Sequence, residues 1–229
     1  MRDYVLVHGA MGGGWGWRRI RPLLSAKGHA VFTPTLTGLG ERVHLVTPEV
    51  NLTTHITDVV NCLQYEDLSD IVLVGHSYAG MVITGVVEQA AERIAHLVYV
   101  DAVLPQDGQS MVDINGQPPG GDGWLMPVPD PPPGQTPEQA AAWSRLVPHP
   151  RATLEEKVHL SQPLETQRFT RTYIKAANPP RNPENPGSFW LAADRVRNDP
   201  AWRYFELPCG HSIQRELPHE LAALLLELA

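Results

Sequence analysis

Short apolar runs alternate with amphipathic segments along most of the chain. Six runs have the length and composition of strands, at residues 4–7, 30–32, 71–74, 97–100, 172–174 and 204–207. Between them, apolar residues recur at helical spacing, for example at 56–63 and 217–228. Alternation of strands with helices favours a mostly parallel sheet covered by helices. We therefore expect an α/β fold with about six mostly parallel strands.

The alternation breaks at residues 103–167, and eleven of the chain's 22 prolines fall between Pro105 and Pro150. Proline has no N–H to donate to a neighbouring strand, so we expect no regular strand here. A helix is expected at 138–146, because Thr136-Pro137 is typical of a helix start. The segment is too apolar for a solvated linker, so we predict a lid over a pocket, with a flexible surface insertion as the alternative. The residues expected to line that pocket are Trp124, Leu125, Met126 and Trp143.

Length and composition narrow the class of protein. A chain of 229 residues suits one core, so we expect residues 1–229 to form a single domain. The net charge of -7 and the pI near 5.8 leave no basic stripe for a nucleic acid. No apolar run approaches the roughly 18 residues of a membrane span, and the first residues lack a signal-peptide pattern. We expect a cytoplasmic protein without a membrane partner, with reduced thiols at Cys62 and Cys209.

The candidate nucleophile is Ser77, which comes shortly after the apolar run at 71–74. Gly75 lies two residues before the serine, Ala79 two after it and Gly80 three after it, so the segment departs by one alanine from Gly-x-Ser-x-Gly. That pattern is typical of a sharp turn from strand to helix, where small neighbours leave room for a strained serine. The segment that follows is apolar nearly all round, which indicates a helix buried against a central strand. We therefore expect this serine at the tip of a core element.

A glycine-rich loop at residues 8–14 follows the first predicted strand. A serine nucleophile needs two backbone N–H groups for the developing oxyanion, and we assign these to Ala10 in this loop and to Tyr78. The loop does not match Gly-x-Gly-x-x-Gly, because Trp17 occupies the last position counted from Gly12, and no Lys-Ser or Lys-Thr follows. We therefore do not expect this loop to bind a nucleotide. We also expect no other cofactor and no metal.

The candidate base is His211, which follows the last predicted strand and precedes the terminal helix. Enzymes with this type of serine turn have the chain order serine, acid, histidine, and His211 comes suitably late. His219, at the start of the terminal helix, fits less well. For the acid we favour Asp101, which ends the fourth predicted strand and would emerge beside the serine if the two strands pair. Asp194 and Asp199 are the alternatives, together with the absence of any acid partner.

These motifs together resemble the α/β-hydrolase superfamily over nearly the whole chain, and in particular its branch of plant methylesterases, hydroxynitrile lyases and bacterial carboxylesterases. The resemblance implies a six-stranded sheet, a lid after the fourth strand, and cofactor-free hydrolysis of small esters through an acyl-enzyme. The segments that carry it are Val5-Leu6-Val7-His8-Gly9-Ala10, Trp15-Gly16-Trp17, Val74-Gly75-His76-Ser77, residues 99–105 and Gly210-His211.

The chain departs from that branch at the acid. Plant members place an aspartate after the fifth strand, where this chain has Asn178, and an acid at Asp101 resembles some haloalkane dehalogenases instead. Those enzymes use an aspartate nucleophile, and Ser77 argues against their reaction.

A second comparison separates esterases from lyases within the branch. Hydroxynitrile lyases have a threonine after the loop histidine and a lysine after the catalytic histidine, where this chain has Gly9 and Ser212. The resemblance therefore implies a serine hydrolase that cleaves a small, hydrophobic or aromatic carboxylic ester. The alternatives are a lyase or lactone-processing enzyme on the same scaffold, and a small-ligand-binding module without catalysis.

Overall fold

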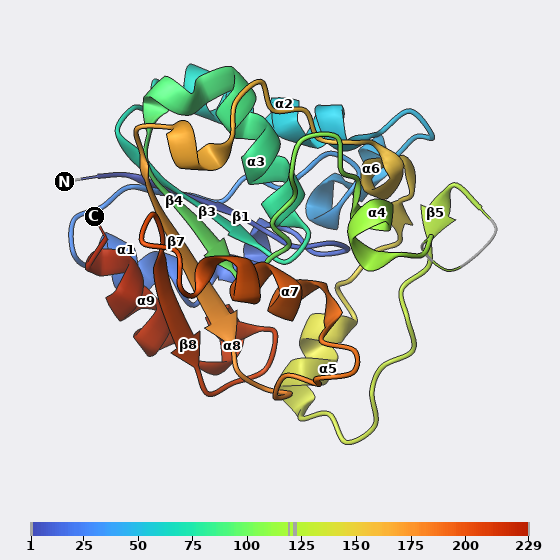
Figure 1. Ribbon diagram of the computed structural model, residues 1–229. Coiled ribbons are helices and arrows are strands. Elements are labelled where there is room, and N and C mark those ends of the chain that lie inside the picture. The colour runs from blue at the N-terminus through green and yellow to red at the C-terminus, as the bar shows by residue number, and fades with distance from the viewer. Residues whose placement is uncertain (1, 119, 121–122, 229) are drawn as a thin grey trace.

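The central feature of the molecule is a six-stranded parallel sheet (Figure 1). The structure, a computed structural model, describes residues 2–118, 120 and 123–228. The strand order is β2-β1-β3-β4-β7-β8. The strands are β1 (Tyr4–Val7), β2 (Val31–Phe32), β3 (Ile71–His76), β4 (Ile94–Val100), β7 (Thr170–Ala176) and β8 (Arg203–Leu207). Five of the six apolar runs lie within these strands and the run at 30–32 extends one residue before β2, so the predicted α/β fold is confirmed.

Both faces of the sheet are buried under helices. Successive side chains of a strand point to opposite faces, so each strand contributes to two apolar cores. In β1, Val5 and Val7 belong to one apolar core, whereas Tyr4 and Leu6 belong to the other. The first core includes residues of α2 (Leu52–Tyr65), α3 (Ala79–Ala90) and α7 (Gly187–Val196). The second includes residues of η1 (Gly14–Trp17), α1 (Arg21–Ser25), α8 (Ile213–Glu216) and α9 (Pro218–Leu226). Figure 1 shows these two helical layers on either side of the strands.

In the part that the structure describes, segment 103–167 forms a separate set of short elements, including the strands β5 (Leu125–Met126) and β6 (His149–Pro150), and adds no strand to the central sheet. Two of them, β5 and β6, pair as an antiparallel ladder of two residues each. The expectation that proline excludes strands here is wrong for this pair. Pro150 lacks the backbone N–H but keeps its carbonyl, and a ladder of two residues forms without that N–H. The elements are α4 (Met111–Asn115), β5 (Leu125–Met126), α5 (Pro137–Trp143), β6 (His149–Pro150), α6 (Ala152–Glu155) and η4 (Leu164–Thr166).

Helix α5 begins one residue before the predicted start at 138 and ends before the predicted end. Thr136 caps it by accepting a hydrogen bond from the Gln139 N–H, and Pro137 occupies the first turn. The helix ends at Trp143, three residues before the predicted end. The other short helices of the fold are η2 (Gly40–Leu45) and η3 (Ala91–Arg93). Among the described residues, no helix combines the length and the apolar character needed to cross a membrane.

The two cysteines are free thiols, as the sequence predicts. Cys62 lies in α2, and Cys209 is buried just after β8. Burial, followed by nearby carboxylates, raises the pKa of each thiol to about 11. At neutral pH both cysteines are therefore protonated and are poor nucleophiles.

Candidate active site

Ser77 lies in the sharp turn between β3 and α3, at the carboxyl edge of the sheet. Its φ is 59°, in the left-handed region that side chains other than glycine rarely adopt. The Ser77 N–H donates to the Val100 carbonyl over 3.3 Å, and the Ser77 carbonyl accepts from the Val103 N–H over 3.2 Å. The end of β4 and the residues after it therefore hold the backbone of this strained serine.

Glycine is required three residues after Ser77, whereas alanine fits two residues after it. A Cβ added at Gly80 would lie 1.9 Å from the Val103 carbonyl oxygen, which is a severe clash with backbone. Ala79 is fully buried without such a conflict. A Cβ at Gly75 would lie 2.8 Å from Ile83 on α3. The alanine in the motif is therefore compatible with the turn, because the closest backbone approach occurs at Gly80.

Ser77, His211 and Asp101 form one chain of hydrogen bonds. The Ser77 Oγ lies 2.9 Å from His211 Nε2, and His211 Nδ1 lies 2.6 Å from Asp101 Oδ2. With the proton on Nδ1, the imidazole donates to the carboxylate and can accept the serine proton at Nε2. Adjacent parallel strands bring Ser77 and Asp101 together, because β3 and β4 pair directly and their carboxyl ends meet at the same edge. His211 comes from the loop after β8.

The other acids considered from the sequence have different partners. Asp194 on α7 pairs with Arg181 at 2.8 Å and with Arg197 at 3.7 Å. Asp199 accepts a hydrogen bond from the Ala201 N–H. His219, the alternative base, is exposed on α9. The structure therefore brings His211 to Asp101 rather than to the later aspartates.

A lysine that the sequence reasoning did not consider lies beneath this group. The Lys175 Nζ donates to Asp101 Oδ1 over 2.6 Å, and both side chains are buried. Burial opposes ionisation of Asp101, but hydrogen bonds and charge from His211 and Lys175 outweigh it and hold the pKa of Asp101 below its ordinary value. Asp101 is therefore a carboxylate at neutral pH. The available sequence signal was a lysine between apolar residues, directly after the predicted strand at 172–174.

Two neighbours contact His211 in addition to Ser77 and Asp101. The His76 Nε2–H donates to the His211 carbonyl over 2.8 Å, and the Phe189 ring stacks on the His211 imidazole with centroids 4.6 Å apart. Burial and, next, the charge of His211 lower the pKa of His76 to about 3. His76 is therefore a neutral structural histidine beside the candidate base.

The loop after β1 approaches Ser77 closely. A Cβ added at Gly9 would lie 2.9 Å from the Ser77 Cβ, so a threonine at this position would require a shift. Neither the Ala10 N–H nor the Tyr78 N–H donates to a protein group within the described part of the chain. The next N–H, that of Met11, donates to His149 Nδ1 over 3.2 Å. Among the residues described, the two predicted oxyanion donors therefore have no acceptor, whereas the N–H of Met11 is bonded to His149.

Three buried histidines support this loop in their neutral forms. His8 donates from Nδ1 to the Gly9 carbonyl, and His149 accepts from the Met11 N–H. His55 lies 3.0 Å from the Tyr78 hydroxyl. Burial lowers the pKa of His8 and of His55 to about 4, and that of His149 well below its ordinary value. Protonation of His149 would place a hydrogen on Nδ1, which now accepts from the Met11 N–H. Two donors would then face each other, and the loop would be disrupted.

We expect the protein to lose stability as the pH falls from about 6.5 to about 4. In this window the histidines bind protons in the unfolded chain, whereas the buried histidines of the folded state stay neutral because their pKa values are lower. The free energy of unfolding therefore decreases as the pH falls. Each such histidine contributes about 1.4 kcal/mol per pH unit, so the combined loss should reach several kcal/mol. Urea unfolding at pH 7 and pH 5 measures it. Equal free energies of unfolding at the two pH values would contradict the neutral assignment.

Two cavities meet at Ser77, each with a volume of about 200 Å³. Ala10 and Tyr78 border the first, whose walls are largely apolar, and His211 borders the second. Segment 103–167 contributes walls to both. These walls include Met111, Met126 and Leu154 in the first cavity, and Trp143 and Leu146 in the second.

The predicted pocket residues are thus divided. Met126 and Trp143 line the cavities beside Ser77. Trp124 is 43% exposed and Leu125 pairs with Pro150, and neither lines either cavity. Leu125 and Met126 are successive residues of β5, so their side chains point to opposite faces of the ladder, and Met126 is the one that lines the cavity. We therefore retain two of the four residues as candidates for substrate contact.

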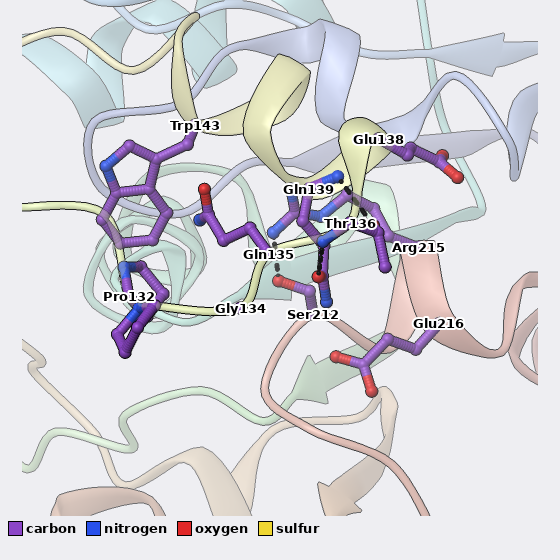
Figure 2. Close-up of a pocket in the computed structure, with 11 residues that line it drawn as sticks. Pro132, Gly134, Gln135, Thr136, Glu138, Gln139, Trp143, Ser212, Arg215 and Glu216 are labelled. Atoms are coloured by element: carbon purple, nitrogen blue, oxygen red, sulfur yellow. Dashed lines mark hydrogen bonds between the residues drawn. The ribbon is translucent and has the colours of Figure 1, made fainter.

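A wider hollow of about 430 Å³ opens next to the His211 side (Figure 2). It shares Trp143, Ser212 and Arg215 with the cavity that contains His211. Figure 2 shows residues from the start of α5 together with Arg215 and Ser212 around this hollow. The Arg215 guanidinium donates a hydrogen bond to the Ser212 hydroxyl. This hollow therefore adjoins the second cavity, and polar side chains line it at their shared border.

The overall fold has close counterparts among solved structures. An extracellular alpha/beta-hydrolase from a Paenibacillus species superimposes with a TM-score of 0.82 at 23% identity, over 100% of this chain and 99% of that one. A pyrethroid hydrolase from Sphingobium faniae gives a TM-score of 0.72 at 21% identity, over 99% and 96% of the two chains. At these identities the likeness shows a common fold.

Sequence comparison adds named relatives, and those described below are esterases. The carbendazim hydrolyzing esterase of Nocardioides sp. (strain SG-4G) is 37% identical over 248 aligned positions, which cover 100% of each chain. Methylesterase 1 of Arabidopsis thaliana is 32% identical over 120 positions, covering 48% of this chain and 42% of the relative. The profile of the alpha/beta hydrolase family matches residues 4–224. With its parallel sheet, serine turn and esterase relatives, this chain belongs to the alpha/beta hydrolase family.

Proposed function

We propose that the protein is a carboxylic ester hydrolase that acts through an acyl-enzyme on Ser77. The observation that carries the proposal is the continuous hydrogen-bonded chain from Ser77 through His211 to Asp101. A serine hydroxyl is a weak nucleophile, and an adjacent oriented base activates it. The relationship to esterases supports the same reaction class.

The first half of the proposed reaction forms the acyl-enzyme. Ser77 Oγ attacks the ester carbonyl carbon while its proton passes to His211 Nε2. The carbonyl oxygen becomes an oxyanion and accepts hydrogen bonds from the N–H groups of Ala10 and Tyr78. His211 then returns the proton to the alcohol oxygen as the bond between that oxygen and the acyl carbon breaks. The alcohol leaves, and the acyl group stays on Ser77.

The second half repeats these steps with water. His211 removes a proton from a water molecule that attacks the acyl carbon, and a second oxyanion forms at the same N–H groups. The proton then passes to Ser77 Oγ as its bond to the acyl carbon breaks. Asp101 keeps the imidazole oriented and stabilises its charge in both halves.

The cavities suggest the class of ester. The meeting of two cavities of about 200 Å³ at Ser77 suits a compact ester with its acyl and alcohol parts on opposite sides. Their apolar and aromatic walls, including Met126 and Trp143, favour a hydrophobic or aromatic substrate. In this proposal, segment 103–167 serves as the lid of a single catalytic domain. Methyl esters of small aromatic acids are therefore the first substrates to test.

The test combines a covalent probe with substrate turnover. A fluorophosphonate should label Ser77 in a one-to-one ratio, and the labelled protein should lose its ester hydrolysis in proportion. p-Nitrophenyl acetate in rapid mixing should give a burst of p-nitrophenol no larger than the enzyme concentration. Folded protein that resists the probe and releases no alcohol from a panel of esters and lactones would contradict the proposal. Turnover without any covalent labelling would favour a lyase.

A further inference from the structure

Lys175 places a buried ammonium group against the carboxylate that bonds His211. Its side chain is 4% exposed, and Nζ lies 2.6 Å from Asp101 Oδ1 and 2.6 Å from the Ala176 carbonyl oxygen. The same Nζ lies 4.4 Å from the centroid of the Trp190 ring, over its face. A buried ammonium is costly unless it is paired and hydrogen-bonded. These three partners therefore hold the charge at one place behind the acid.

The two oxygens of Asp101 have separate partners. Oδ1 accepts from Lys175 Nζ and from the Ala176 N–H over 3.3 Å, whereas Oδ2 accepts from His211 Nδ1. Asp101 itself has a φ of 40°, so its backbone is in the left-handed region. The Asp101 N–H donates to the Ile174 carbonyl over 2.7 Å, which ties this residue to the strand that carries Lys175. Strand β7 thus fixes which oxygen faces the imidazole.

We propose that Lys175 is a positioning residue for proton transfer between Ser77 and His211, a role that rests on the proposed esterase function. Its ammonium holds Asp101 with Oδ2 toward the imidazole, and its charge balances the carboxylate. Without Lys175, a buried carboxylate with no cationic partner would favour the protonated imidazole. A protonated His211 cannot accept the Ser77 proton. Lys175 thereby favours the form of His211 that accepts the Ser77 proton.

Other charged or titratable groups also face His211. His76 of β3 donates to the His211 carbonyl, and burial keeps it neutral by lowering its pKa to about 3. Arg215 of α8 lines the same cavity as His211, and the Phe189 ring of α7 that stacks on the imidazole is uncharged. These groups and Asp101 are unchanged when Lys175 is replaced. A shift in the pH dependence of catalysis would therefore result from the loss of the Lys175 charge.

The test measures kcat/KM against pH for Lys175→Met, Lys175→Gln and Lys175→Arg, with an ester that the wild type hydrolyses. In the Met and Gln variants, the midpoint of the acidic limb should rise by about one pH unit, because both lose the charge. Glutamine keeps a hydrogen-bond donor, so its plateau should stay above that of the Met variant. Lys175→Arg should keep the wild-type midpoint. Unmoved midpoints in folded Met and Gln variants would overturn the proposal.

Thr172→Val is the matched control for a merely structural effect. Thr172 is buried on the same strand, and its hydroxyl lies 2.8 Å from His96 Nε2, away from Ser77. This variant should lower the melting temperature without moving the midpoint. An equal shift in Thr172→Val and in Lys175→Met would reduce Lys175 to a structural residue and overturn the assignment.

A measurement on the wild type covers the case in which the Lys175 variants do not fold. The nitrogen-15 signal of the Lys175 ammonium should change with pH at the midpoint of the acidic limb, since His211 is joined to it through Asp101. A nitrogen-15 signal that does not change at this midpoint would overturn the positioning role of Lys175. Absence of Ser77-dependent turnover in the wild type would instead contradict the proposed function. An active wild type with unmoved midpoints would contradict the role of Lys175 alone.

Discussion

Replacing Ser77 by alanine should lower kcat by at least roughly 10⁴-fold, because no other group can form the acyl-enzyme at this position. The Ser77 hydroxyl lies 2.9 Å from His211 Nε2, where its proton can be removed. The oxyanion donors and cavity walls stay in place, so a residual rate above that of water is expected. Initial rates on the best aromatic methyl ester, with and without the substitution, measure the effect.

Ser161→Ala is the matched control for this change. Ser161 is exposed, and its hydroxyl bonds Glu88 on the surface, so its replacement should leave kcat within about twofold of wild type. The Ser77→Ala protein should also bind a non-hydrolysable substrate analogue with nearly wild-type affinity, since it loses only one oxygen atom. A Ser77→Ala protein that keeps a tenth or more of wild-type kcat would exclude Ser77 as the nucleophile.

The sheet was predictable because each strand is a local apolar run. In a parallel sheet with both faces buried, strands such as Ile71–His76 have apolar side chains on both sides, so the signal needs no knowledge of neighbours. The position of Ser77 was predictable for a similar reason, because the turn after β3 must contain small residues. Chain order then pointed to His211.

Contacts between distant segments were less accessible. Which small residue the turn requires depends on the Val103 carbonyl, which belongs to the segment after the neighbouring strand and approaches Gly80. The anchoring of Met11 by His149 joins two segments 138 residues apart. A sequence pattern records local spacing, so it could suggest the glycine-rich loop without indicating the histidines beneath it.

Segment 103–167 was hardest to predict in detail. Its composition indicated apolar walls, and Met126 and Trp143 do line the cavities. The orientation of Trp124 and Leu125 depends on the two-residue ladder of β5 with β6, which propensity did not indicate. A short ladder is set by contacts of the whole segment rather than by its own sequence.

Asp101→Asn should lower kcat by roughly 10³- to 10⁴-fold, whereas Asp194→Asn should change it by less than about twofold. An amide at position 101 cannot stabilise the imidazolium as a carboxylate does, and it would favour the wrong tautomer of His211. Asp194 instead pairs with Arg181 and Arg197 on the surface of α7. Parallel kcat measurements compare the two variants, and a large loss confined to Asp194→Asn would exclude Asp101 as the acid.

Asp101→Asn should also lower the free energy of unfolding, which distinguishes the buried Asp101 from an exposed acid. Asp101→Asn leaves the ammonium of Lys175 buried without its carboxylate, and breaking a buried pair in this way costs about 3–5 kcal/mol. Asp194→Asn should leave the free energy of unfolding within about 0.5 kcal/mol, because its ion pairs are partly exposed. Adding Lys175→Met to Asp101→Asn should restore much of the lost stability without restoring kcat, since it removes the unpaired charge but supplies no carboxylate. Recovery of both stability and kcat in the double variant would show that Asp101 serves only to neutralise Lys175.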